Sequence, residues 1–186
     1  MFCEGDHSDF VLVVVEGRLK LVVTTVEGGE SVLGIRGPGA LVGELAAFHR
    51  GPRMATAVAL EPLVTRVVAA DEFRAFVADQ PEVGLELIGM LIGRLREADR
   101  RRLEFGNYDT LSRVARLLGD LATDQASSAS DPLEVRLSQA EVAGLVGASR
   151  ESVARALGSL RTRGLVTTGR RTIMILDSDA LLSLAG

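Results

Sequence analysis

The chain has 186 residues, of which 47% are hydrophobic, and it carries a formal net charge of −4. No apolar run approaches the roughly 20 residues of a membrane-spanning helix and no basic-then-apolar signal segment opens the chain, so we expect a cytoplasmic protein without a membrane partner. Cys3 is the only cysteine, which excludes an intrachain disulfide and any four-cysteine iron–sulfur or zinc site. His7 and His49 stand apart from other candidate ligands, so we predict no metal site.

Residues 1 to about 70 are rich in short apolar runs separated by turn residues such as Glu16-Gly17 and Glu27–Glu30. Five of these runs are predicted as strands: Phe10–Val15, Arg18–Thr25, Ser31–Ile35, Ala55–Leu60 and Leu63–Val68. The close, regular spacing favours an antiparallel roll or barrel over alternating βαβ units. A helix is predicted at Asp71–Ala78, so that residues 1–80 form one β-roll domain.

From Glu82 to about Phe105 the chain contains no proline and is predicted as one long helix. Six positions recur along it at alternating spacings of three and four: Ile88, Leu91, Leu95, Ala98, Arg102 and Phe105. This heptad spacing, flanked by charged residues, predicts pairing with a second copy of the helix. A helix that packs only on its own roll is the alternative. Residues 81–106 are therefore expected to be a dimerisation helix with its hinge.

The third expected domain covers residues 107–186. Gly106 and Asn107 interrupt the helical pattern, and Asp109 can cap a further helix at Thr110–Thr123. The polar segment Asp124–Pro132 is predicted as a loop that leads into the rest of this domain.

The segment from Leu137 to Leu160 has the pattern of a helix-turn-helix. Ser138 and Glu141 form a capping box, Gly147 stands where the first helix must end, and Ser149 can cap the second. At about 100° per residue, Arg150, Glu151 and Arg155 project within roughly 140° of one another on the second helix. The opposite side of that helix is aliphatic: Val153, Ala156, Leu157 and Leu160. Polar groups able to contact base edges therefore face outward.

A short hairpin with a basic tip follows this motif. Leu165–Thr168 and Thr172–Leu176 are predicted strands, and Gly169-Arg170-Arg171 is the turn between them, placed to lie against phosphate. From Leu133 to Leu176 there are seven arginines and three glutamates, so this segment is positive although the whole chain is negative. That distribution favours DNA binding over an amphipathic hairpin whose charges merely face solvent.

Four stretches, GPGALVGELAAF, GPRMATAVAL, RVARLL and LVGASRESVARAL, closely resemble the CRP/FNR family of bacterial transcription regulators. The resemblance covers nearly the whole chain. It implies an α+β fold in which an N-terminal antiparallel β-roll, like a cyclic-nucleotide-binding domain, is joined by a long dimerisation helix to a C-terminal winged helix-turn-helix. It also implies a homodimer that binds a near-palindromic site in double-stranded promoter DNA and acts on RNA polymerase.

The resemblance assigns roles to the residues of the reading domain. Arg150, Glu151 and Arg155 match base-reading positions, where arginine can contact guanine and glutamate can accept from cytosine. Five residues are expected to contact phosphate: Ser138, Gln139, Ser149, Arg170 and Arg171.

The expected effector site matches the family only in part. Gly43, Glu44, Arg53 and Ala55 match the residues with which some members hold cyclic AMP, but Met54 stands where they have a hydroxyl residue. Ala98-Asp99 departs from their polar pair on the long helix, and the helix and strand that normally precede Glu4-Gly5-Asp6 are absent. Cyclic AMP or another small effector is therefore one expectation. A degenerate pocket, in which Glu44 and Arg53 cap a short helix and pair with each other, is the other.

Three functions are open for a chain with these residues. The first is a dimeric DNA-binding regulator, and the second is a nucleotide-sensing module with little DNA binding. The third is an enzyme, for which the chain offers no nucleophile with its base, no metal cluster and no phosphate-binding P-loop. The arginines of the helix-turn-helix and of its hairpin favour the first.

Overall fold

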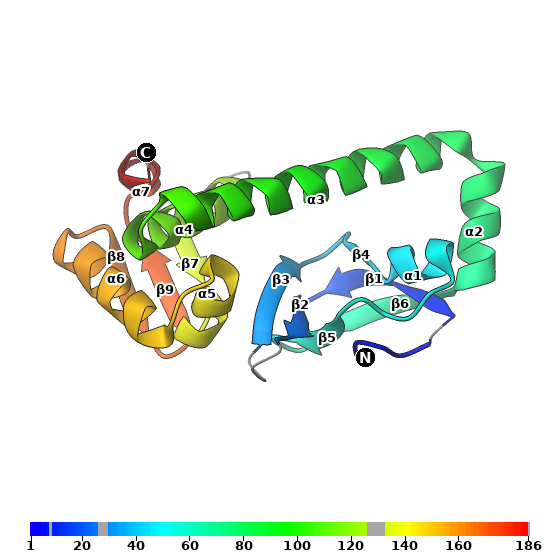
Figure 1. Ribbon diagram of the computed structural model, residues 1–186, viewed down its shortest axis with the longest axis horizontal. Helices are drawn as coiled ribbons and strands as arrows, with labels where there is room; N and C mark the ends of the chain where they lie inside the picture. Colours follow the sequence, from blue (N-terminus) through cyan, green and yellow to red (C-terminus); the bar gives the residue numbers. More distant parts are fainter. Residues whose placement is uncertain (8, 26–29, 126–132, 186) are drawn as a thin grey trace. The chain divides into compact units, whose positions relative to one another are not determined.

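The computed structural model describes the whole chain except residues 8, 26–29, 126–132 and 186. Its contacts divide the chain into two compact units, Met1–Arg96 and Glu97–Gly186, with the division inside the long helix α3, Pro81–Asn107 (Figure 1). Among the described residues, no helix is long and apolar enough to cross a membrane.

Two three-stranded antiparallel sheets form the roll of the first unit. One has the strand order β4-β1-β6 and the other β3-β2-β5. The bounds are β1 Phe10–Glu16, β2 Leu19–Thr24, β3 Glu30–Arg36, β4 Leu41–Val42, β5 Thr56–Ala59 and β6 Val64–Ala69. All five predicted strands are present, and the two-residue β4 was not predicted. The predicted turn at Glu27–Glu30 lies largely outside the described residues.

Each face of β1 buries a separate apolar cluster, as the alternation of side chains along a strand requires. One cluster joins the two sheets: Phe2, Leu12, Val14, Leu19, Val42 and Ala57. The other packs Val11 of β1 against the helices α1, Glu44–His49, and α2, Ala70–Asp79. Helix α1 begins after Gly43, whose φ of 90° glycine tolerates without strain.

The first half of α3 presents an apolar stripe to solvent. Leu85, Ile88, Ile92 and Leu95 recur at spacings of three, four and three and are 46–69% exposed. Ile88 and Leu95 belong to the predicted heptad seam, but Leu91, which also belonged to it, is half-buried, and Ile92 faces solvent instead. The other predicted seam positions, Ala98, Arg102 and Phe105, are also exposed, so Leu91 is the one predicted position that is not.

The second unit is a winged helix-turn-helix. Its helices are α4 Thr110–Gln125, α5 Gln139–Val146, α6 Arg150–Thr162 and α7 Ser178–Leu184, and its strands are β7 Leu133–Val135, β8 Val166–Gly169 and β9 Thr172–Ile175. The sheet order is β7-β9-β8. The core residues with 0% exposure include Val114, Leu118, Val142, Val153, Leu160, Ile175 and Leu181. Strand β7 and helix α7 were not predicted, and most of the predicted loop at Asp124–Pro132 lies outside the described residues.

Candidate nucleic-acid interface and effector cavity

The predicted capping box at the start of α5 is present. Ser138 donates its backbone N–H and its hydroxyl to Glu141 Oε2, both at 2.7 Å, and the Glu141 N–H donates to Ser138 Oγ at 3.2 Å. Gly147 ends α5 with a φ of 58°. Arg113 of α4 donates to the carbonyl of Val146 at 2.8 Å, so a cation satisfies a carbonyl at the negative end of this helix. The start and the end of α5 are therefore both fixed by side chains.

Helix α6 presents the predicted polar residues to solvent. Ser149 caps it by accepting from the Ser152 N–H at 3.2 Å. Arg150, Glu151 and Arg155 are exposed, and Arg155 also donates to Ser152 Oγ at 3.0 Å. The opposite face, predicted to be apolar, is buried: Val153, Ala156, Leu157 and Leu160. The three polar side chains are therefore exposed together at the N-terminal end of this helix.

The carboxylate of Glu151 is held in its ionised form. Its own backbone N–H lowers the pKa most, the Ser149 hydroxyl adds to this, and the positive charges of Arg150 and Arg155 contribute in the same direction. An ionised carboxylate only accepts hydrogen bonds. Glu151 can therefore receive a donor such as the amino group of cytosine, but it cannot donate to guanine O6.

The two wing arginines differ in their surroundings. Arg170 is exposed, whereas Arg171, with a left-handed φ of 57°, donates from Nη2 to Glu141 Oε1 at 3.0 Å. Of the two predicted phosphate contacts on the wing, Arg171 is thus already bound to the helix-turn-helix.

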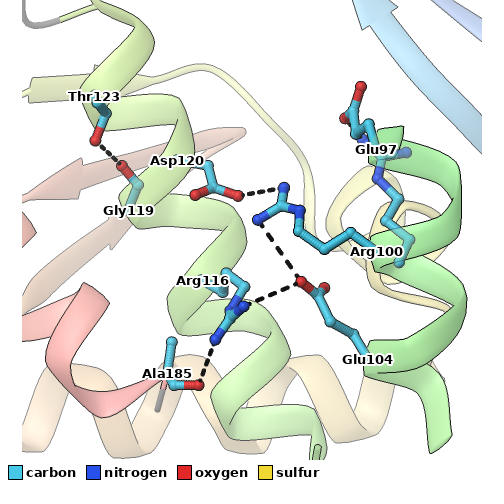
Figure 2. A network of polar contacts seen from close by, with 9 residues as sticks. Glu97, Arg100, Glu104, Arg116, Gly119, Asp120, Thr123 and Ala185 are labelled. Atoms are coloured by element: carbon cyan, nitrogen blue, oxygen red, sulfur yellow. Dashed lines mark hydrogen bonds and ion pairs between the residues drawn. The ribbon is translucent and has the colours of Figure 1, made fainter. Parts of the chain in front are cut away.

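A network of ion pairs joins the end of α3 to α4 (Figure 2). Arg100 contacts Asp120 at 2.7 Å, and this hydrogen bond raises the pKa of its guanidinium. Glu104, which is buried, lies 3.7 Å from Arg100 and 3.5 Å from Arg116, and Arg116 also donates to the carbonyl of Ala185 at 2.9 Å. The network borders a cavity of about 610 Å³ within the second unit.

Phe105 continues this contact to the helix-turn-helix. Its ring lies 5.3 Å from the Arg113 guanidinium, and it is so close to Gly147 that a Cβ there would stand 2.5 Å from Phe105 Cε1. Phe105 is also a position of the predicted dimer seam. It is 50% exposed, and its ring lies against the turn that precedes α6.

The predicted effector residues line one cavity of the roll, of about 160 Å³. Gly43, Glu44, Arg53 and Ala55 all contribute to its wall, as the resemblance implied. The remaining lining is mostly apolar, with two further arginines: Phe2, Leu21, Leu33, Arg36, Val42, Leu45, Ala46, Met54 and Arg94.

Arg53 forms part of the interior of the roll. It is 2% exposed and donates to the carbonyls of Gly43 at 2.8 Å and Phe10 at 2.5 Å. Its guanidinium also lies over the rings of Phe2 and Phe10, 4.2 and 4.8 Å from their centroids. Burial lowers the pKa of Arg53, and the negative charge of Glu44 opposes this shift.

Glu44 forms an ion pair with Arg94 of α3 at 2.5 Å and is as deeply buried as Arg53. Arg94 also donates to the carbonyl of Leu41 at 2.8 Å. Met54, at the position of the family's hydroxyl residue, is 67% exposed and has no hydrogen to donate. The volume of this cavity is below the roughly 300 Å³ of the smallest typical ligand pockets. Because Arg53 donates to backbone carbonyls and position 54 offers no hydroxyl, these two residues do not fit a cyclic phosphate as they are placed.

Residues 1–80 match the family described as "Cyclic nucleotide-binding domain", and residues 112–184 match "Crp-like helix-turn-helix domain". The "CRP-like cAMP-activated global transcriptional regulator" of Mycobacterium tuberculosis is 33% identical over 183 residues, which cover 97% of this chain and 82% of that relative. The chain belongs to the CRP/FNR family of transcription regulators.

Two further proteins place this CRP/FNR regulator within the family. The "Cyclic AMP receptor protein" of Thermus thermophilus is 31% identical over 185 residues, covering 100% of this chain and 83% of that protein. The crystal structure of TTHB099, a CRP-family transcriptional regulator from the same organism, has a TM-score of 0.81 and 26% identity and covers 100% of this chain and 92% of its own. The predicted family, fold and function as a DNA-binding regulator are confirmed.

Three contacts of this CRP/FNR regulator were not predicted from the sequence. They are the ion pair of Glu44 with Arg94, the bond from Arg113 to Val146, and the bond from Arg171 to Glu141. Each joins residues 30 or more positions apart, so no short-range pattern indicates it.

Proposed function

We propose that this regulator reads DNA sequence through Arg150, Glu151 and Arg155. The observation that carries the proposal is their common exposure at the N-terminal end of α6, whose opposite face is buried in the second unit. Helix N-termini of this motif enter the major groove, where arginine and ionised glutamate have complementary partners on guanine and cytosine. The alternative of a nucleotide sensor with little DNA binding lacks this kind of support, because it gives these exposed side chains no role.

The test is the affinity of Arg150→Ala for a duplex that the wild-type protein selects from a random-sequence pool. We expect a loss of about 1–3 kcal/mol, or roughly 5- to 150-fold, together with relaxed preference at one base position per half-site. Arg66→Ala, an exposed arginine of β6 in the other unit, is the matched control and should bind as the wild type does. Unchanged affinity and preference in Arg150→Ala would show that Arg150 reads no base.

We further propose that the regulator binds a near-palindromic site as a homodimer. The exposed stripe Leu85, Ile88, Ile92 and Leu95 supports pairing through α3, because an apolar seam at heptad spacing is stabilised by a second helix. A two-fold dimer presents two copies of α6, which matches two half-sites of opposite orientation. We propose RNA polymerase as its protein partner and the cytoplasm as its compartment. We propose no catalytic activity.

Ser138, Gln139, Ser149 and Arg170 are the proposed phosphate contacts. Ser138 and Ser149 stand at the N-termini of α5 and α6, where backbone N–H groups and the helix dipole favour anions. Arg170 lies exposed on the wing. Such contacts position the protein without reading sequence, so their removal should weaken binding equally on all duplexes.

For the roll we propose that the cavity of about 160 Å³ has no useful affinity for cyclic AMP or cyclic GMP, so that any small-molecule effector is another compound. Relatives described as cAMP-activated make cyclic AMP the first compound to test. The buried bonds of Arg53 and the exposed Met54 argue for weak binding, so we expect no rise in melting temperature at millimolar cyclic AMP or cyclic GMP. A rise of several degrees would show that the cavity opens for a cyclic nucleotide, and Met54→Ser, which restores a hydroxyl beside Arg53, should then increase it.

A further inference from the structure

One carboxylate joins the start of α5 to the tip of the wing. Glu141 uses Oε2 to accept both the N–H and the hydroxyl of Ser138, and Oε1 to accept from Arg171. Only 8% of the Glu141 side chain is exposed, whereas 58% of the Arg171 side chain is exposed. Both oxygens of a buried acid are thus engaged, one within the helix-turn-helix and one by the wing.

The backbone of Arg171 is unusual for a residue that has a Cβ. Its φ of 57° lies in the left-handed region, which a residue with a Cβ seldom adopts and glycine adopts freely. Strained backbone of this kind persists where surrounding contacts over-determine it. The paired strands β8 and β9 close this turn at Gly169 and Thr172, and the bond to Glu141 adds a side-chain contact from the turn to α5.

The same bond changes the charge of the wing. The guanidinium of Arg171 is opposed at 3.0 Å by the carboxylate of Glu141, so its contribution to the positive field around the wing is largely cancelled. Arg170, the neighbouring residue, is exposed at the tip. Arg170 therefore presents its positive charge to DNA, whereas most of the charge of Arg171 is opposed by Glu141.

We propose that Arg171 is a positioning residue and not a phosphate contact. Its ion pair with Glu141 fixes the distance between the wing, which carries Arg170, and the N-terminus of α5, which carries Ser138 and Gln139. Both elements can then meet phosphates without an ordering cost at the moment of binding. The inference rests on the proposed DNA binding of these residues.

Salt dependence distinguishes the two roles. A residue that neutralises a phosphate releases a counterion, so its removal lowers the slope of log affinity against log salt by about one per subunit. A positioning residue weakens binding and leaves the slope unchanged. We would measure this slope by fluorescence anisotropy on the duplex selected by the wild-type protein, for Arg170→Ala, Arg171→Gly, Glu141→Gln and the Arg171→Gly/Glu141→Gln double variant.

The variants are chosen to leave the fold intact. Glycine at position 171 accepts the left-handed backbone, so its melting temperature should not fall. Glutamine at position 141 preserves the capping box, in which glutamate and glutamine are equivalent, and removes the charge. Arg171→Lys, which keeps a positive charge, should recover part of the lost affinity.

We expect Arg171→Gly and Glu141→Gln each to weaken binding about threefold to tenfold with the wild-type slope, and the double variant to be no weaker than either alone. Arg170→Ala should lower the slope. The proposal is overturned if Arg171→Gly lowers the slope as Arg170→Ala does, if it binds as tightly as the wild type, or if the two single effects multiply. If the wild-type protein selects no duplex at all, it is the proposed DNA binding that fails.

Discussion

Replacement of Gly147 by alanine should destabilise the second unit by about 2 kcal/mol. The left-handed backbone at φ 58° accounts for about 1–2 kcal/mol of this, because a Cβ there approaches the following carbonyl. The new methyl group would also stand 2.5 Å from Cε1 and 2.9 Å from Cζ of Phe105, so the ring must move. In a unit of about 60–100 residues, each kcal/mol lowers the melting temperature by roughly 4–8 °C, so we expect a fall of about 8–16 °C.

Tyrosine fluorescence can follow this unit within the intact chain. Tyr108 is the only tyrosine, there is no tryptophan, and Tyr108 lies in the second unit. Gly106→Ala is the matched control, because a Cβ on this helical glycine meets no atom within 4 Å and alanine favours helix.

A double-mutant cycle isolates the contact with the ring. In Phe105→Ala/Gly147→Ala the methyl group no longer meets a ring, so the double variant should lose at least about 0.5 kcal/mol less than the two single variants combined. Additive losses would show that Phe105 does not contact the turn. A melting temperature of Gly147→Ala equal to that of Gly106→Ala would refute the backbone argument as well.

Two further predictions concern the dimer and the hinge. Ile92→Glu puts a charge in the middle of the exposed stripe of α3 and should convert a dimer to monomers, as measured by analytical ultracentrifugation. The control variant Glu86→Lys lies off the stripe and should stay dimeric. If Ile92→Glu were also dimeric, the interface would lie elsewhere. Asp109 accepts the Ser112 N–H at 2.8 Å, and this bond, with that of the Ser112 hydroxyl, lowers its pKa from the ordinary 3.8. A carboxyl whose pKa is lowered on folding stabilises the protein above its unfolded pKa and loses this effect as the pH falls through its folded pKa. The melting temperature of the wild type should therefore exceed that of Asp109→Asn at neutral pH and converge with it below pH 3.8, and a difference that persisted in acid would contradict the assignment.

The features that could be predicted from sequence are those set by neighbours along the chain. The capping box of Ser138 and Glu141 needs only a four-residue pattern, and the outward direction of Arg150, Glu151 and Arg155 needs only the period of a helix. Their contacts with DNA stay a prediction, which rests on charges that are local to one segment.

The features that could not be predicted depend on distant partners. Strand β7 has three residues and exists because it pairs with β9, about forty residues later, through Val135 and Ile173. Heptad spacing also does not tell which positions of α3 are covered within one chain, and Leu91, a predicted seam position, is half-buried. The family resemblance predicted that Arg53 lies at the effector cavity, but only the fold shows that Arg53 donates hydrogen bonds to the carbonyls of Gly43 and Phe10.

The contacts of Arg53 give the Gly-Glu and Arg pattern, with which some family members hold cyclic AMP, a structural role in the roll as well. Loss of the side chain would remove one donor from each of the carbonyls of Gly43 and Phe10 and the cation from two aromatic rings, so the roll itself would select for arginine here. Glu44 is retained by its bond to Arg94 in the same way. A lineage that no longer responded to any nucleotide would keep both residues. A survey that takes this Gly-Glu and Arg pattern as proof of nucleotide binding would therefore include family members that no longer bind a nucleotide. The residue at the neighbouring position, Met54 in this chain, indicates binding better than the pattern does.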